Sequence, residues 1–295
     1  MNIFMNTILC FIAVAIFEQP TYAQVMKSVD FSENSQPVVV AYEGTEVTLQ
    51  PFSEKDTSSV EIVALVKATG FASISIREGL STVSYHPVEV GIGKLNDSDP
   101  APSVLLGGYT GGAHCCATLI VITANAGKLK TLEFEPIDGG PETEFPKDVD
   151  GDGTVDFIRQ DDSFRYEFAS GAGSYSPPRI YNVYKGQIVD ATEQSAYRPI
   201  WLTFANEVRK VCSDKTNPDR NGACIALAAA GARLGNFQNS FKEAVANANK
   251  GDDALLPSSC SVELIDDLCP KGKDIRFYSF ESAANWFLRQ RKYVE

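Results

Sequence analysis

One nine-residue segment, Asp148 to Asp156, constrains this chain more than any other. It reads DVDGDGTVD, with carboxylates at its first, third, fifth and ninth positions and glycines at its fourth and sixth. Carboxylates this close repel one another unless a cation lies between them. Calcium takes about six to eight oxygen ligands, and a loop that turns at glycine presents alternate side chains to one point. The spacing therefore predicts a calcium site. The alternative is a solvated acidic turn, since Asp and Gly are common turn residues.

This segment differs from an EF-hand loop, which ends in a bidentate Glu and lies between two helices. Here the corresponding residue is Arg159, and residues 155–159 alternate like a strand. A DxDxDGxxD loop that runs directly into a strand resembles the integrin-type FG-GAP calcium-binding repeats. The resemblance implies five ligand residues: Asp148, Asp150, Asp152 and Asp156 through their carboxylates, and Thr154 through its backbone carbonyl.

A degenerate copy of the same pattern covers residues 93–106. Asn96 and Asp97 precede an expected strand there, but Pro100 and the missing glycine break the ligand set. The two copies lie about 50 residues apart, a period typical of a four-stranded propeller blade. Because a propeller needs about four to eight blades to close, we expect an incomplete propeller or an irregular sandwich.

Residues 24–190 are predicted to form a mainly β domain, because short runs of β-branched residues alternate with Gly, Pro and Ser. Strands are expected at residues 38–42, 46–49, 60–66, 72–76, 88–92, 103–106, 118–123, 132–134, 155–158 and 180–184. Strands at this density without intervening helices favour propeller-like or sandwich sheets. With the helical pattern that follows, the predicted fold class is α+β.

From residue 191 to residue 295 the apolar spacing is helical. We expect one helix around Trp201 to Val211, a long Ala-rich helix from about Ala223 to Asn249, and a last helix from Phe280 to Arg291 with Ser279 as its N-cap. The apolar stripes are interpreted as core; the alternative is that part of one stripe binds a partner.

Four cysteines belong to this C-terminal region, and their even number indicates disulfides. Of the three possible pairings, Cys212–Cys224 with Cys260–Cys269 is favoured because each bridge closes a short loop. These bridges would make residues 191–295 a small disulfide-stapled helical unit.

Residues 1–23 are predicted to be an export signal, with a short apolar run and a cleavage site before Gln24. The run is too short to span a bilayer, and no later apolar run reaches the length of about 18 residues that spanning requires. We therefore expect a periplasmic or secreted protein without stable membrane insertion. The formal net charge of −12 disfavours nucleic acid and anionic membranes as partners.

A second candidate site is the Gly-rich segment from Gly107 to Cys116, which contains Tyr109, His114 and Cys115. The two adjacent cysteines could bond to each other, or each could find its own partner. Alternatively, His114 and the thiolates could bind a soft metal, which requires reduced cysteines in an oxidising compartment.

No established catalytic motif is present in the chain. The sequence favours an exported calcium-binding protein that acts as a non-enzymatic recognition module, with an extracytoplasmic protein or glycan as its partner. Two alternatives remain open: an extracytoplasmic hydrolase of a polymer that uses calcium structurally, and a metal or redox site at His114, Cys115 and Cys116.

Overall fold

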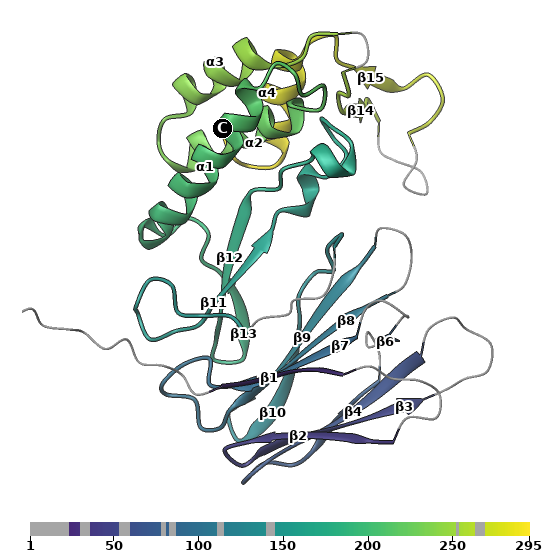
Figure 1. The fold of residues 1–295 in the computed structure, drawn as a ribbon, viewed down its shortest axis with the longest axis vertical. Helices are drawn as coiled ribbons and strands as arrows, with labels where there is room; N and C mark the ends of the chain where they lie inside the picture. Colours follow the sequence, from purple (N-terminus) through teal and green to yellow (C-terminus); the bar gives the residue numbers. More distant parts are fainter. Residues whose placement is uncertain are drawn as a thin grey trace, which may run out of the picture.

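The computed structural model describes residues 24–29, 36–52, 60–77, 81–82, 87–110, 115–139, 145–251, 254–262 and 269–295. The predicted export signal, residues 1–23, lies outside the described residues, and so do His86 and His114. Figure 1 shows β-sheets at one end of the molecule and helices at the other. The predicted α+β class is confirmed: a mainly β N-terminal region of open antiparallel sheets precedes helices with paired cysteines.

Three antiparallel sheets make up the N-terminal region. The central sheet has the order β1 (Gln24–Val29), β7 (Val88–Gly93), β8 (Ser103–Tyr109), β9 (Ala117–Asn125), β10 (Lys128–Glu133). The outer sheet has the order β2 (Val38–Tyr42), β3 (Thr45–Phe52), β4 (Val60–Ala68), β5 (Ile74–Ile76), and β6 (Ser81–Thr82) also pairs with β4. The bridging sheet consists of β11 (Asp156–Gln160), β12 (Pro178–Tyr184) and β13 (Gln187–Asp190).

The central sheet is buried on both faces, as strand β8 illustrates. Its residues alternate between two separate cores because neighbouring side chains on a strand point to opposite faces. Val104 and Leu106 pack with the outer sheet, whereas Leu105 packs with residues of the bridging sheet such as Phe157. Every residue of β8 is buried, which explains its near-continuous apolar sequence. The outer and central sheets thus form a sandwich, and the bridging sheet packs on its other side.

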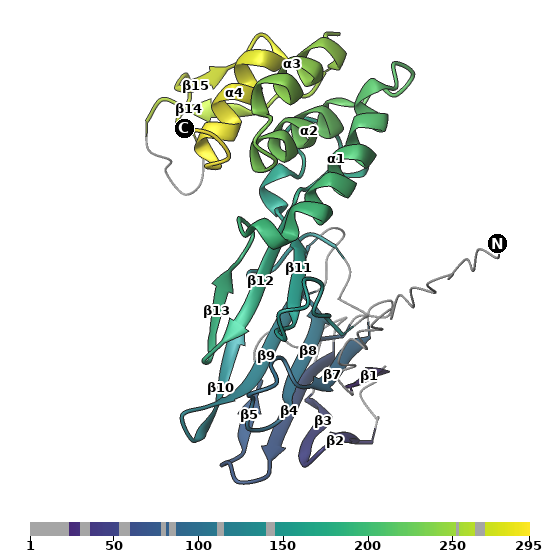
Figure 2. The same ribbon diagram turned by 90° about the vertical axis from the view of Figure 1, so that its left-hand side faces the viewer.

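The C-terminal region contains four α-helices and one hairpin within the described residues. They are α1 (Arg198–Ser213), α2 (Asn221–Arg233), α3 (Phe237–Asn247) and α4 (Phe280–Gln290), with strands β14 (Ser258–Cys260) and β15 (Asp274–Arg276) between α3 and α4. The helices pack around one apolar core that also takes in Phe164, Phe168 and Ile180 of the bridging region. Figure 2 shows the bridging sheet between the sandwich and these helices. None of the described helices is long and apolar enough to cross a membrane.

The expectation of one long helix from Ala223 to Asn249 is wrong, because the structure has two helices there. The chain turns at Gly235, whose φ of +72° is a conformation that glycine adopts without a steric penalty. The amide of Asn236 donates to the carbonyl of Gly231 at 2.8 Å, which closes the end of α2. At α4 the expected cap is present: the Ser279 side chain accepts a hydrogen bond from the amide of Ser282.

The cysteines of the C-terminal region lie at disulfide distance in the favoured pairing. Cys212 and Cys224 have their Cα atoms 4.8 Å apart and join α1 to α2 inside the core. Cys260 and Cys269 have theirs 5.6 Å apart and join the hairpin strand β14 to the segment before β15. Both distances fall in the range of ordinary disulfides. The two bridges restrict the C-terminal region at two separate places.

The double burial of the central sheet predicts equal sensitivity on its two faces. Leu105→Ala and Leu106→Ala should each lower the free energy of unfolding by about 2–5 kcal/mol, because each leaves a cavity in a different core. Leu202→Ala, at a side chain that is 43% exposed on α1, is the control and should change it by less than about 1 kcal/mol. Urea unfolding measures all three. A small effect for either Leu105 or Leu106 would mean that its face of the sheet is not packed.

Candidate metal centre

The acidic loop brings three of its four carboxylates together directly before strand β11. Oxygens of Asp148, Asp150 and Asp156 lie within 4.8 Å of one another, the group that could hold a metal ion among the described residues. Two oxygens on opposite sides of a calcium ion lie about 5 Å apart, since each Ca–O distance is about 2.3–2.6 Å. The three carboxylates are therefore close enough to share one such ion.

Backbone amides hold the loop in this shape. Gly151 and Gly153 donate their N–H groups to the two oxygens of Asp148, at 2.6 and 3.0 Å. Both glycines have positive φ, +81° and +86°, a conformation that L side chains rarely adopt. The glycine positions in the sequence pattern thus have a physical cause, because they let the chain wrap around its first carboxylate.

Asp152, another predicted ligand, is not part of this close carboxylate group, and Thr154 lies two residues before Asp156 in the same loop. The exposed side chain of Asp152 accepts a hydrogen bond from the amide of Thr154 at 2.7 Å. The hydroxyl of Thr154 accepts one from the side-chain amide of Asn96 at 3.0 Å. Whether Asp152 and the Thr154 carbonyl bind a metal therefore stays a prediction.

Asp156 connects the loop to the rest of the molecule. Asp156 is 2% exposed, and its carboxylate accepts three hydrogen bonds, one of them to Oδ2 from the amide of Val149 at 2.8 Å. The other two go to Oδ1, from the side-chain amide of Asn182 at 2.7 Å and from the hydroxyl of Tyr197 at 2.6 Å. A buried carboxylate is costly unless donors or cations compensate its charge. The donors come from the loop, from β12 and from the residue before α1, so Asp156 fixes these three segments to one another.

The electrostatics of the loop favour a bound cation. Burial raises the pKa of the Asp150 carboxyl, and the negative charges of Asp152, Asp156 and Asp148 raise it as well, against a lowering by the hydrogen bond from the Asp152 amide. Burial, and then the hydrogen bond to Asp156, raise the pKa of Tyr197, so its hydroxyl keeps its proton and donates. A cation among these carboxylates would relieve the repulsion that disfavours their ionised form.

The predicted degenerate copy lies against the acidic loop. The amide of Val155 donates to the carbonyl of Leu95 at 2.8 Å, beside the bridge between Asn96 and Thr154. Within this copy, Oδ2 of Asp99 accepts hydrogen bonds from the amides of Leu95 and Asn96, both at 3.0 Å. Its carboxylate therefore closes its own turn, and the segment acts as a brace for the acidic loop.

At the second candidate site the adjacent cysteines are bonded to each other. Cys115 and Cys116 form a disulfide and are joined by a cis peptide bond. The amide of Cys116 donates to the hydroxyl of Thr110 at 2.8 Å, which fixes the pair to the end of β8. Tyr109 is a buried residue of that strand. Because His114 lies outside the described residues, a metal or redox site formed by His114, Cys115 and Cys116 stays a prediction.

The sequence analysis missed two residues that hydrogen-bond to Asp156 of the candidate metal centre, namely Asn182 and Tyr197. Each lies more than twenty residues from Asp156, on a different element, and neither belongs to a local motif. A carboxylate that becomes buried at the start of a strand needs hydrogen-bond donors. The sequence does not show which distant residues supply them.

Comparison with known proteins finds two relatives. The chain is 27% identical over 219 residues to a probable thylakoid lumen protein of Synechocystis sp., in a match that covers 72% of the chain and 63% of that protein. It is 25% identical over 273 residues to an uncharacterized protein of Sinorhizobium fredii, in a match that covers 89% of the chain and 41% of that protein. The chain thus spans well under the full length of both relatives. No family model matches it, and no solved structure does.

The hydrogen bond between Tyr197 and Asp156 predicts a measurable contribution to stability. Tyr197→Phe keeps the buried ring but removes one donor to a buried carboxylate, so the free energy of unfolding should fall by about 1–3 kcal/mol. Tyr184→Phe is the matched control because its side chain is 51% exposed, and it should change that energy by less than about 0.5 kcal/mol. Guanidinium unfolding in the presence of a chelator compares the two. Equal effects would show that the hydroxyl of Tyr197 contributes nothing specific.

Proposed function

We propose that this chain is an exported calcium-binding protein in which the acidic loop holds Ca²⁺ as a structural ion. The observation that carries the proposal is the group formed by Asp148, Asp150 and Asp156, on a loop whose shape its own amides maintain. Oxygen ligands are the ones that hard cations prefer, whereas zinc and copper favour nitrogen and sulfur. The local resemblance to FG-GAP repeats supports calcium over magnesium, and it would add Asp152 and the Thr154 carbonyl as ligands.

The extracytoplasmic location is supported by two independent observations. Disulfides persist in oxidising compartments, and the structure pairs all six cysteines after residue 23. One relative is described as a probable thylakoid lumen protein, which is also a compartment outside the cytoplasm. We infer a periplasmic, secreted or lumenal location for this chain.

The role of the ion is to make the β-rich region a rigid recognition surface. Calcium would hold the acidic loop between the central sheet, through the brace at Leu95 and Asn96, and the bridging sheet, through Asp156. We propose that this assembly presents a surface to an extracytoplasmic protein or glycan and does not catalyse a reaction.

The first test is unfolding with calcium and with a chelator. At a calcium concentration 100 times its dissociation constant, the wild type should gain about 2.7 kcal/mol in the free energy of unfolding, because the ion binds only the folded state. Asp150→Asn should lose this gain. Asp97→Asn, an exposed Asp in the neighbouring degenerate copy, is the control and should keep it.

Two further unfolding measurements extend this test: the stability of Asp150→Asn with chelator, and the response of the wild type to magnesium. With chelator, Asp150→Asn should be at least as stable as the wild type, since the raised pKa of Asp150 means that its charge is disfavoured in the folded state. Magnesium should stabilise the protein less than calcium, because it demands a tighter octahedral shell and dehydrates reluctantly. No response to calcium, or an equal response in Asp150→Asn, would contradict the proposed site.

Recognition is tested by applying the labelled mature protein to a glycan array with calcium and with chelator. Binding should require calcium and should be lost in Asp150→Asn. Equal glycan binding with calcium and with chelator would show that recognition does not depend on a metal in the acidic loop.

A further inference from the structure

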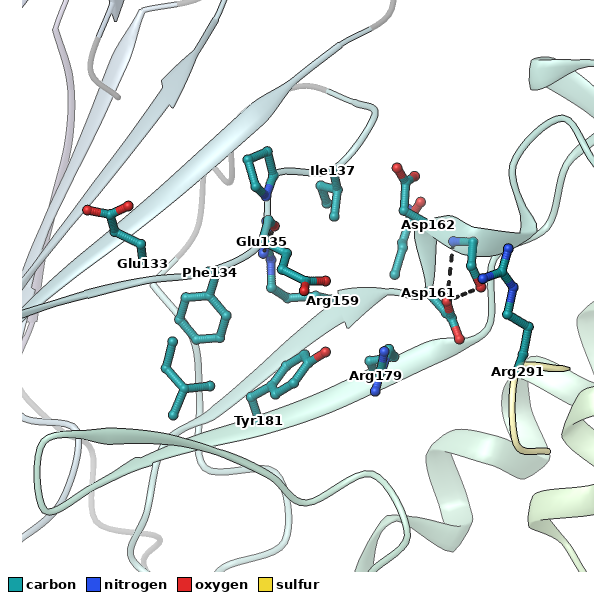
Figure 3. Close-up of a pocket in the computed structure, with 14 residues that line it drawn as sticks. Glu133, Phe134, Glu135, Ile137, Arg159, Asp161, Asp162, Arg179, Tyr181 and Arg291 are labelled. Atoms are coloured by element: carbon teal, nitrogen blue, oxygen red, sulfur yellow. Dashed lines mark hydrogen bonds between the residues drawn. The ribbon is translucent and has the colours of Figure 1, made fainter. Parts of the chain in front are cut away.

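A cavity of about 520 Å³ lies beside the bridging sheet, between the segment that follows β10 and the residues that follow α4. This volume is typical of small-molecule sites, which measure about 300–1,000 Å³. Its wall includes two aromatic rings and one aliphatic side chain, from Phe134, Tyr181 and Ile188, and three arginines, Arg159, Arg179 and Arg291. Figure 3 shows that the three arginines come from three different segments of the chain. We call it the arginine cavity.

Arg159 supplies a buried positive charge to this cavity. It is 5% exposed, and its guanidinium carbon lies 5.2 Å from the centre of the Phe134 ring. Its Nη1 donates to the carbonyl of Glu135 at 2.7 Å. These contacts hold the guanidinium in one place, so the charge is preorganised and has little conformational freedom left to lose when a ligand binds.

Arg179 and Arg291 bring hydrogen-bond donors to the same cavity. Arg179 lies over the ring of Tyr181, 5.7 Å from its centre, and uses one nitrogen, Nη2, to bond Asp190 at 2.8 Å. The Arg291 side chain lies over the Phe287 ring, 5.3 Å from its centre, and forms a long ion pair of 3.9 Å with Glu167, with no hydrogen bond to a described residue. A guanidinium carries five N–H donors, so both side chains have donors to offer to a ligand.

The two aspartates on the cavity wall interact with other residues of the protein, although the buried Oδ1 of Asp162 accepts no hydrogen bond from a described residue. Asp161 accepts from the amide and hydroxyl of Ser163 through Oδ1 and from the hydroxyl of Tyr293 through Oδ2. Asp162 accepts a hydrogen bond from the amide of Asp138 through Oδ2 at 3.2 Å, and its Oδ1 forms an ion pair with Arg165 at 3.5 Å. The other two acidic residues of the wall, Glu133 and Glu135, are exposed. Water and salt therefore screen their negative charge.

From this arrangement we propose that the arginine cavity binds a small organic anion, with its carboxylate or phosphate group on Arg179 and Arg291 and its apolar body against Tyr181. Guanidinium groups match both oxyanions in geometry and bind them through paired hydrogen bonds. The rings beside the arginines suit a flat or apolar ligand body. We treat this site as separate from the calcium loop, because the two arginines that would hold the anion pair with Asp190 and Glu167, which lie outside that loop.

The test titrates the mature protein with benzoate and with phenyl phosphate by calorimetry, with benzyl alcohol as the neutral ligand of similar shape. At least one anion should bind, and benzyl alcohol should bind at least roughly tenfold more weakly, because charge-assisted hydrogen bonds are the stronger kind. The anion with the higher affinity indicates whether the natural ligand carries a carboxylate or a phosphate. Failure of both anions to bind, or equal binding of benzyl alcohol, would overturn the proposal.

Three variants locate the binding. Arg179→Gln and Arg291→Gln should each lower the affinity for the anion by roughly tenfold or more. Arg209→Gln is the control, because Arg209 pairs with Glu243 between α1 and α3. It should leave the affinity for the anion unchanged. Arg291→Gln keeps the test decisive if Arg179→Gln fails to fold, since the Arg291 side chain has no hydrogen bond to a described residue to lose. Unchanged affinity in Arg291→Gln would overturn the site. Repeating each titration with chelator keeps this result separate from the calcium proposal.

Discussion

The structure depends on one buried carboxylate, that of Asp156. It ends the acidic loop, begins the bridging sheet and accepts hydrogen bonds from the loop, from β12 and from Tyr197. Tyr197 belongs in turn to the core of the helical region. Because a buried carboxylate must keep its donors or bind a cation, these segments cannot separate without exposing or stranding that charge. The loop that carries the metal proposal is thus also the junction between sheets and helices.

Local signals predicted much of this arrangement. β-branched runs marked the strands, and Ser279 marked the start of α4, because both depend on residues close in the sequence. The same holds for the acidic loop, whose Asp and Gly spacing is visible without any structure. The prediction of one long helix after Ala223 was wrong because it also used local signals alone. The Ala-rich apolar pattern continues past Gly235 and hides the turn there.

Long-range packing was beyond the sequence. Nothing in β8 tells which of Leu105 and Leu106 faces the outer sheet, since both faces of that strand are apolar. Tyr197 and Asn182 are polar residues of ordinary appearance until the fold brings them to Asp156. The three arginines of the arginine cavity likewise come together only through the positions of β11, β12 and the end of α4.

The most direct test of this account is amide hydrogen exchange with and without calcium. If the ion fixes Asp156, exchange should slow in the acidic loop and also at the start of α1, which follows Tyr197, while β2 and β3 of the outer sheet should exchange as before. Slowing confined to the loop would contradict the account, because the ion would then bind without stabilising the junction between sheets and helices.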